Sequence, residues 1–227
     1  MSAAARPGIV ELHARSLELA AEVVDAVRPE RLDLPTPCAG WTLRRLLAHV
    51  VGQQQGFAAA ARGAGPDLAL WADAPIGEGL PGEDPAGAFR RTAVELTAAF
   101  REAAAADRRV WLPELLTTAP IPLDRAVGFH LLDTLVHAWD VAAALGTGAG
   151  VGAAVEREEA LIAALVAVAE AVPDTPEARA PGRAFGPGLP PGEGEAAGVG
   201  AGRFERVLAM LGRDPAWPGP GSGPGQG

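Results

Sequence analysis

Apolar residues recur along this chain at intervals of three and four positions, which is the spacing of one face of an α-helix. The pattern predicts six helices, over residues 9–27, 43–61, 85–106, 123–145, 156–172 and 203–211. Four of them are long enough to bury facing apolar stripes in a bundle. Strands would draw on β-branched and aromatic residues, and aromatic residues make up only 5% of the chain. We therefore expect an all-α fold built on a four-helix bundle with extra short helices.

The segments between the predicted helices differ in character. Residues 63–87 are rich in Gly, Pro and Asp, yet they contain Leu68, Leu70, Trp71 and Ile76, which indicates a flap packed over the bundle. Residues 173–202 contain 14 Gly or Pro and predict a flexible linker. Residues 212–227 contain 10 and predict a disordered tail. The bundle then occupies residues 1–172, and the short helix 203–211 is expected to dock on it.

Charge and composition exclude several classes of protein. The net charge of −9 argues against nucleic-acid binding and against a membrane-surface role, both of which favour basic patches. No apolar run approaches the roughly 20 residues of a membrane-spanning helix, and the first ten residues lack the apolar core of a secretory signal. The single cysteine, Cys38, excludes an internal disulfide and a four-cysteine zinc site. We expect a cytoplasmic protein.

Polar residues form a stripe on the otherwise apolar segment 123–145. His130, Asp133, His137 and Asp140 follow one another at intervals of three and four, so they share one helix face. Buried polar groups must be solvated, paired or bound to a metal. Asp133 and His137 are four positions apart and present two metal-ligating atoms to one point. A hydrogen-bonded pair on a solvated face is the simpler alternative.

A third metal ligand must come from another helix, and His49 is the candidate. It is the one polar residue in the apolar run Leu46–Val51. Two ligands from one helix and one from its neighbour are a common way to build a metal site in a bundle. Three nitrogen and oxygen ligands leave a coordination position open, as in catalytic rather than structural zinc sites.

Three stretches of sequence resemble a known family. Leu34–Gly52, which contains the sequence PTPCAGWTLRRLLAHVVG, and Asp133–Ala142 resemble the two motifs of the mycothiol-dependent maleylpyruvate isomerase N-terminal-domain family. Phe204–Pro215 is similar to the ending of a short, actinobacterial metal-binding branch of that family. The resemblance implies a DinB-like four-helix bundle that holds a divalent metal, usually zinc. It assigns the three ligand positions to His49, Asp133 and His137.

Other residues carry open alternatives. His130 can be a fourth ligand, a proton relay or a partner of Asp133, and Asp140 can orient an imidazole through its second nitrogen. Cys38 is a nucleophile, a soft ligand or, as we favour, a small buried loop residue. His13 lies between Glu11 and Arg15 and is expected at the surface.

Local signals refine the reading of three segments. Thr42 is in position to cap the helix that carries His49. The Gly-rich run 148–152 lacks the strand and the Lys–Ser/Thr of a phosphate loop. The acidic run 156–159 is expected to form a solvated first helical turn.

The family resemblance implies an enzyme of thiol chemistry. Mycothiol, or another low-molecular-weight thiol, would be the cosubstrate, and a small electrophile would be the substrate, in S-transfer or isomerisation at the metal. Arg44 or Arg45 can face an anionic substrate. Full isomerases of the family carry a second α/β domain, for which this chain offers only the linker and one helix, so maleylpyruvate isomerase activity itself is not expected. We expect a monomer or a homodimer.

Two other functions fit the same residues. One is a non-catalytic metal-binding module with a regulatory or partner-binding role, in which the coordination sphere is closed. The other is a metal-free hydrogen-bonded network. An open ligand position reached by a pocket, roofed by the flap at Leu68–Trp71, would favour an enzyme over both.

Overall fold

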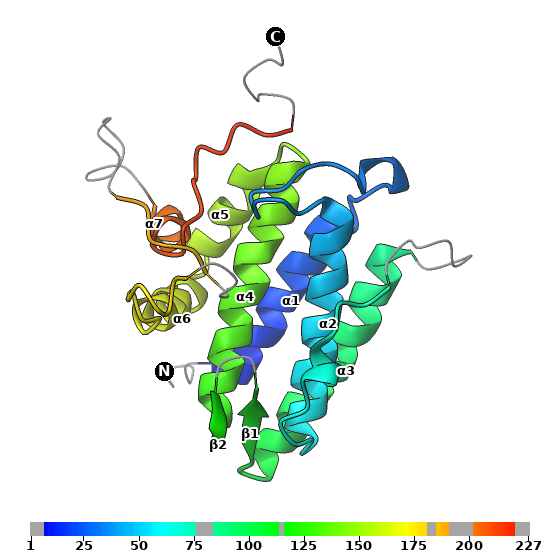
Figure 1. Ribbon diagram of the computed structural model, residues 1–227, viewed down its shortest axis with the longest axis vertical. Helices are drawn as coiled ribbons and strands as arrows, with labels where there is room; N and C mark the ends of the chain where they lie inside the picture. Colours follow the sequence, from blue (N-terminus) through cyan, green and yellow to red (C-terminus); the bar gives the residue numbers. More distant parts are fainter. Residues whose placement is uncertain (1–6, 76–83, 114–115, 181–184, 191–201, 221–227) are drawn as a thin grey trace, which may run out of the picture.

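A computed structural model describes residues 7–75, 84–113, 116–180, 185–190 and 202–220 of the 227-residue chain. Its centre is a bundle of four long helices, α1 (Ile9–Val24), α2 (Leu43–Ala61), α3 (Pro85–Ala105) and α4 (Leu123–Ala144) (Figure 1). Helix α1 packs along α4, and α2 packs along α3. Helix α4 also contacts α2 and α3, so its residues are buried on nearly all sides. The predicted all-α fold and its four-helix bundle are confirmed.

The helix that carries His49 begins where the sequence predicts. Thr42 has extended backbone, and its side chain accepts a hydrogen bond from the Arg45 backbone N–H, which caps α2. Just before it, Gly40 adopts a φ of +77°, a left-handed conformation that glycine takes without strain. The cap and the turn together fix where α2 starts, and therefore how high His49 sits in the bundle.

Two elements were not predicted. Strands β1 (Arg109–Leu112) and β2 (Leu116–Pro122) form an antiparallel hairpin between α3 and α4, at the lower end of the bundle in Figure 1. Val110, Leu112 and Ile121 are buried, so the hairpin closes this end of the core. The strands are too short to show a clear alternation in the sequence.

The predicted fifth helix is wrong in its boundaries, because the chain forms two helices there. Helix α5 (Gly148–Glu156) contains the Gly-rich run, and α6 (Glu159–Glu170) follows after a two-residue break. Small residues suit α5 because a Cβ on Gly152 would lie 3.3 Å from the Phe204 ring. The acidic run is therefore not a single solvated helical turn: Glu156 and Glu159 both form ion pairs with Arg203.

The flap lies against α2. The described part of the chain has two short 3-10 helices, η1 (Pro29–Arg31) and η2 (Leu68–Trp71). The flap contains η2, whose buried Trp71 packs edge-to-face against Phe57 of α2, with ring centroids 4.8 Å apart. Leu68 is 60% exposed, and Ile76 lies outside the described residues. The next residues follow α2 upwards, where the Ala74 backbone N–H bonds Ala48 O at 2.8 Å. Trp71 thus covers the middle of α2, and residues 72–74 run past its first half.

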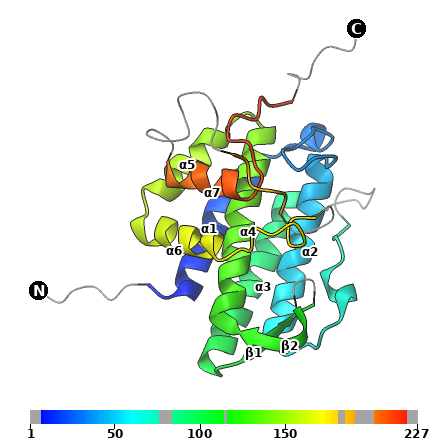
Figure 2. The ribbon, with the colours of Figure 1, turned by 60° about the vertical axis from the view of Figure 1, so that its left-hand side comes forward.

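The C-terminal region is anchored on the bundle. Helix α7 (Arg203–Met210) packs on α5 and α6, and all three lie on the side of the bundle formed by α1 and α4 (Figures 1 and 2). Its apolar face is buried, as expected for a docked helix. In the described parts of the predicted linker and tail, Arg179 and Arg213 are both buried, and Trp217 packs against the core. The described residues 173–180, 185–190 and 212–220 form no helix or strand, but the two buried arginines still hold these segments against the rest of the protein.

Among the described residues, no helix combines the length and apolar character required to cross a membrane.

Candidate metal centre

Helices α2 and α4 bring His49, Asp133 and His137 together. One ligand atom from each lies within 4.8 Å of the other two. His137 Nε2 is 3.3 Å from Asp133 Oδ1, and the rings of His49 and His137 are 5.5 Å apart at their centroids. Two ligands at about 2.1 Å from a tetrahedral metal are about 3.4 Å apart, so this spacing and donor set fit a divalent ion.

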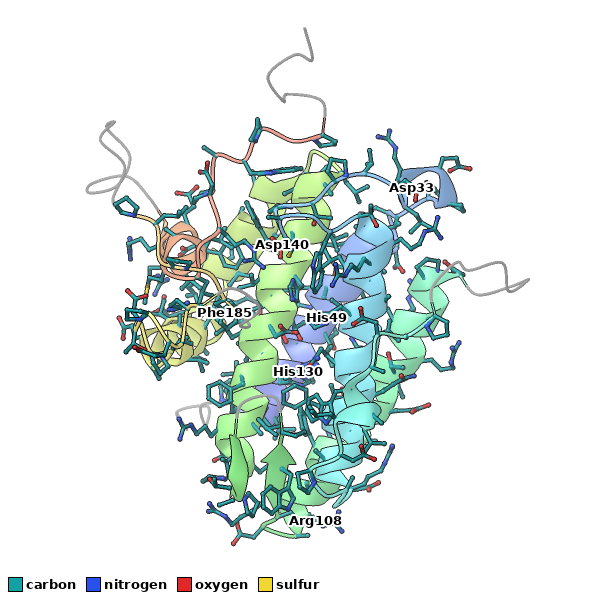
Figure 3. All side chains as sticks on the ribbon, in the orientation of Figure 1. Asp33, His49, Arg108, His130, Asp140 and Phe185 are labelled. Atoms are coloured by element: carbon teal, nitrogen blue, oxygen red, sulfur yellow. The ribbon has the colours of Figure 1, made fainter. Side chains whose placement is uncertain are left out.

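The three side chains differ in exposure. His137 is buried, whereas His49 and Asp133 are partly exposed. In Figure 3, His49 lies between Asp140 above it and His130 below it, so the polar stripe of α4 follows the length of the bundle. The cluster therefore has a buried floor and an edge that solutes can reach.

The second nitrogen of His137 faces Asp140. His137 Nδ1 lies 2.9 Å from Asp140 Oδ2, and the Asp140 side chain is fully buried. Asp140 in turn accepts hydrogen bonds from Arg213, whose Nε is 3.0 Å from Oδ1. The imidazole is thus held from behind, with Nε2 directed towards Asp133. This arrangement places Asp140 where a carboxylate could orient the imidazole of a metal ligand.

Cys38 belongs to a second group of potential ligands, with His137 and Asp140. The thiol donates a hydrogen bond to Asp140 Oδ2 at 3.1 Å, and its Sγ is 4.0 Å from His137 Nδ1. Sγ also accepts from Arg213 Nη2 at 3.1 Å. The buried loop residue expected from the sequence is confirmed, but its polar neighbours come from α4 and from beyond α7, which spacing in the sequence does not reveal.

Charge in the cluster is strongly redistributed. Burial lowers the pKa of His137, but the Asp133 carboxylate and the hydrogen bonds to Asp133 and Asp140 outweigh burial and hold this pKa well above its usual value. Burial raises the pKa of Asp133, but the same attraction to His137 brings it below its usual range. Burial lowers the pKa of His49. Without metal, the centre is therefore an Asp133 carboxylate paired with a His137 imidazolium, beside a neutral His49.

The sequence did not point to Asp73. Its Oδ1 lies 3.4 Å from His49 Nδ1, because residues 72–74 run alongside α2. On another side of His49 stands Trp41, with ring centroids 5.0 Å apart, and the Arg45 guanidinium lies 4.4 Å above the Trp41 ring. His49 is consequently fixed by neighbours on both flanks.

A cavity of about 350 Å³ opens beside this group of residues. Its walls include Asp73, Arg44 and Arg45, together with Ala48, which precedes His49. Trp71 is not among its lining residues, so the part of the flap that borders the cavity is Asp73–Pro75 rather than the predicted Leu68–Trp71. His49, Asp133 and His137 are not among its lining residues; the cavity borders Asp73, and its two arginines give a small anionic or polar solute a place to bind there.

His130 is tied to α1. Its Nδ1 lies 2.8 Å from His13 Nε2 and 3.0 Å from Thr134 Oγ1. The predicted surface position of His13 is wrong, because this side chain is fully buried against His130 and Phe100. The charged neighbours of His13 in sequence point elsewhere on the helix, and the interior of the bundle accepts the imidazole because a second imidazole pairs with it. His130 is not one of the residues that form the two groups of potential ligands.

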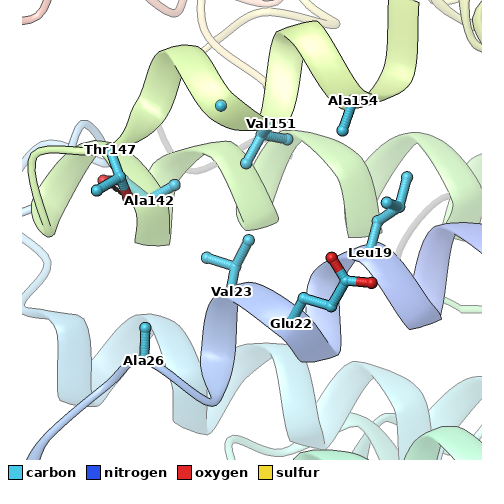
Figure 4. Close-up of a pocket in the computed structure, with 9 residues that line it drawn as sticks. Leu19, Glu22, Val23, Ala26, Ala142, Thr147, Val151 and Ala154 are labelled. Carbon is cyan, nitrogen blue, oxygen red and sulfur yellow. Dashed lines mark hydrogen bonds between the residues drawn. The ribbon is translucent and has the colours of Figure 1, made fainter. Parts of the chain in front are cut away.

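A second cavity, of about 240 Å³, lies between α1 and α5 (Figure 4). Its lining is mainly apolar, and Glu22 and Thr147 are its polar side chains. Neither the proposed ligands nor Asp73, which contacts His49, borders it, so we assign it no part in the chemistry.

The chain is similar to a described family and to specific proteins. The model of the mycothiol maleylpyruvate isomerase N-terminal domain matches residues 13–142. Two proteins of Mycobacterium tuberculosis, Uncharacterized protein Rv0738 and Uncharacterized protein MT0763, are each 31% identical over 141 residues. The match covers 59% of this chain and 65% of each relative, so the chain spans just under two thirds of their length.

Solved structures are similar as well. The crystal structure of the mycothiol-dependent maleylpyruvate isomerase matches with a TM-score of 0.48 at 15% identity, over 71% of this chain and 68% of that one. A histidine-to-alanine mutant of that enzyme gives the same TM-score at 16% identity and the same coverage.

Proposed function

This chain belongs to the mycothiol maleylpyruvate isomerase N-terminal domain family, and from that premise we propose that it binds one divalent metal ion, zinc, through His49, Asp133 and His137. We further propose that it uses this centre to activate a low-molecular-weight thiol, mycothiol, towards a small electrophilic substrate. The observation that carries the proposal is the convergence of three ligand atoms within 4.8 Å from two helices.

The surroundings of the cluster support a metal rather than a simple ion pair. Asp140 holds His137 Nδ1 from behind, so that Nε2 is presented to the centre. His49 contributes a neutral nitrogen because burial lowers its pKa. Two nitrogen donors and one carboxylate form a donor set that zinc accepts, and they leave a position for an exogenous ligand.

The cavity lined by Asp73 supports catalysis over a closed module, because Asp73 contacts the proposed ligand His49. A zinc ion held here would supply Lewis acidity and lower the pKa of a bound thiol. The protein's own residues would do the rest. Asp73 and the arginines of the cavity wall would orient the polar parts of thiol and substrate, and the buried floor beneath His137 would limit the access of water. The reaction would be S-transfer or reversible thiol addition with isomerisation.

Elemental analysis of the purified full chain tests the metal. We expect about one zinc ion per chain in the wild type, and loss of the metal in His137→Ala. His130→Gln is the matched control, because it changes a buried histidine of the same helix that lies two turns from His137 and is bonded to His13 rather than to the cluster; it should keep the metal. Absence of metal from the wild type, even after incubation with zinc, would refute the proposal.

A second measurement tests the thiol. Zinc-loaded protein should be stabilised against heat by mycothiol, and it should accelerate mycothiol's reaction with an activated haloarene. His137→Ala should do neither. If the wild type binds zinc stoichiometrically but is neither stabilised nor active, the chain is a non-catalytic metal-binding module.

A further inference from the structure

Arg213 is buried although it lies in a Gly- and Pro-rich stretch beyond the last helix. Its side chain joins two groups behind the metal centre. Nε donates to Asp140 Oδ1 at 3.0 Å, and Nη2 donates to Cys38 Sγ at 3.1 Å. A buried guanidinium is tolerated only where its charge is paired and its N–H groups are bonded. The fully buried Asp140 carboxylate meets both requirements.

The backbone at the end of α7 directs the Arg213 side chain towards Asp140 and Cys38. Gly212 has a φ of +76°, its N–H bonds Ala209 O, and the Arg213 N–H bonds Leu208 O at 2.9 Å. This pair of bonds is the Schellman ending of a helix, which requires a left-handed residue, usually glycine. A Cβ on Gly212 would also lie 2.8 Å from Pro187 O. The direction in which the chain leaves α7 is therefore set by docked structure.

The Asp140 carboxylate connects Arg213 to a proposed metal ligand. Oδ1 accepts from Arg213 Nε at 3.0 Å, and Oδ2, which also accepts from Arg213 at 3.3 Å, lies 2.9 Å from His137 Nδ1. A carboxylate anchored at both oxygens cannot rotate freely, so it holds the imidazole ring in one orientation. Partners of this kind behind a metal-bound histidine affect affinity without touching the metal.

Arg213 also distinguishes between the two groups of potential ligands. Its guanidinium occupies lone pairs of Asp140 and of Cys38 that a metal in the second group would need. A divalent cation placed there would also be repelled by this positive charge. The His49 side of His137 is the better place for the ion.

We propose that Arg213 is a positioning residue for the metal centre: through Asp140 it orients His137 Nε2 towards His49 and Asp133, so that the C-terminal segment helps to set metal affinity. This inference rests on the metal site proposed above. It adds a residue 73 positions beyond Asp140 in the chain, outside the part that matches the family model.

Competition titration of Zn²⁺ against a chromophoric chelator, with the full chain, tests the inference. Arg213→Gln should weaken zinc binding by about 10- to 100-fold, the usual effect of removing a group that orients a ligand. Arg179→Gln is the matched control. Arg179 is also a buried arginine of the C-terminal region, but it donates to Pro173 O at 3.0 Å and to Gly186 O at 3.3 Å. Its loss should loosen the same region and leave zinc affinity unchanged within error.

A double variant separates positioning from docking. Because Arg213 acts through Asp140, Arg213→Gln should have no further effect on zinc affinity in an Asp140→Asn background. Wild-type affinity in Arg213→Gln would overturn the inference, and so would an equal loss in Arg179→Gln.

If Arg213→Gln does not fold, Arg213→Lys is the deciding variant, since it keeps the positive charge but not the fork of N–H donors. Reduced zinc affinity in Arg213→Lys supports the positioning role, and wild-type affinity refutes it. If the wild type itself takes up no zinc, the proposed function fails; if only the variants behave otherwise, the positioning role alone fails.

Discussion

His13 on α1 and His130 on α4 share a hydrogen bond of 2.8 Å in the interior of the bundle. Both side chains are almost completely shielded from solvent, and the rings of Phe57 and Phe100 surround them. One imidazole donates to the other in this hydrogen bond when both rings are neutral, while His13 Nδ1 and His130 Nε2 are buried without a hydrogen-bond partner among the described residues. A charge on either ring would be buried without a carboxylate bonded to it.

This pair should make stability depend on pH. Burial lowers the pKa of His130 to about 4 and that of His13 well below its usual value, against about 6.5 in an unfolded chain. Because the pKa values in the folded protein are depressed, the free energy of unfolding has its full value above pH 6.5 and decreases as pH falls towards 4. His130 alone would account for about 3 kcal/mol. Urea unfolding of chelator-treated protein between pH 7.5 and 4.5 measures this change in the free energy of unfolding.

The matched control replaces both rings. The double variant His13→Leu, His130→Leu keeps similar volumes and has no imidazole to titrate, so its stability should fall less over the same pH range. An equally steep fall in the double variant would show that other groups cause the pH dependence.

Zinc binding should release protons. His137 carries a proton in the metal-free protein, because the Asp133 and Asp140 carboxylates outweigh burial and raise its pKa. A metal at Nε2 must displace that proton, so apparent zinc affinity should increase by about tenfold per pH unit while pH stays below the His137 pKa. Calorimetric titration in buffers of different ionisation enthalpy counts the protons. Affinity independent of pH between 6 and 8 would contradict an imidazolium at position 137.

The thiol of Cys38 should not be a ligand. Cys38→Ala is expected to retain one ion per chain, because the Cys38 sulfur already accepts a hydrogen bond from the Arg213 guanidinium. His49→Ala should lose the ion, because it removes a proposed ligand. Cobalt substitution provides the check: the wild type should show no thiolate-to-cobalt charge-transfer band in the near ultraviolet. Such a band, removed by Cys38→Ala, would place the metal in the other group of ligands.

Gly52 should be required for the approach of the flap to α2. A Cβ at this position would lie 2.3 Å from the backbone oxygen of Ala72, and backbone cannot move aside cheaply. We expect Gly52→Ala to destabilise the protein by about 1–3 kcal/mol and to free Asp73 from His49. Gly150→Ala is the control, since Gly150 is also helical but has open space around its Cβ position. It should stabilise the protein by about 0.5–1 kcal/mol, and thermal unfolding of both variants measures the difference.

Local patterns in the sequence were sufficient for the four long helices. Their apolar faces repeat over 16 to 22 residues, and Thr42 caps α2 as expected. The proximity of Asp133 to His137 also follows from local geometry, because four residues make about one helical turn. His49 required a comparison between two helices, and its rarity as a polar residue in an apolar run supplied the signal.

Contacts between distant parts of the chain were not predictable in the same way. His13 and His130 are 117 positions apart, and Cys38 and Arg213 are 175 apart. Asp73 reaches His49 only because the flap follows α2, and no periodicity encodes that path. Arg213 had a weak signal, since it belongs to the ending that resembles the family branch, but its Gly- and Pro-rich surroundings suggested disorder instead.

The position of Arg213 has a consequence for how the protein matures on the ribosome. His49, Asp133, His137 and Asp140 all leave the exit tunnel before Arg213, which is translated 73 residues after Asp140. At about 5–20 residues per second, this delay lasts about 4 to 15 s. During that interval the nascent bundle contains a carboxylate without its guanidinium partner. The centre reaches its final arrangement only after Arg213 has been synthesised and has left the exit tunnel.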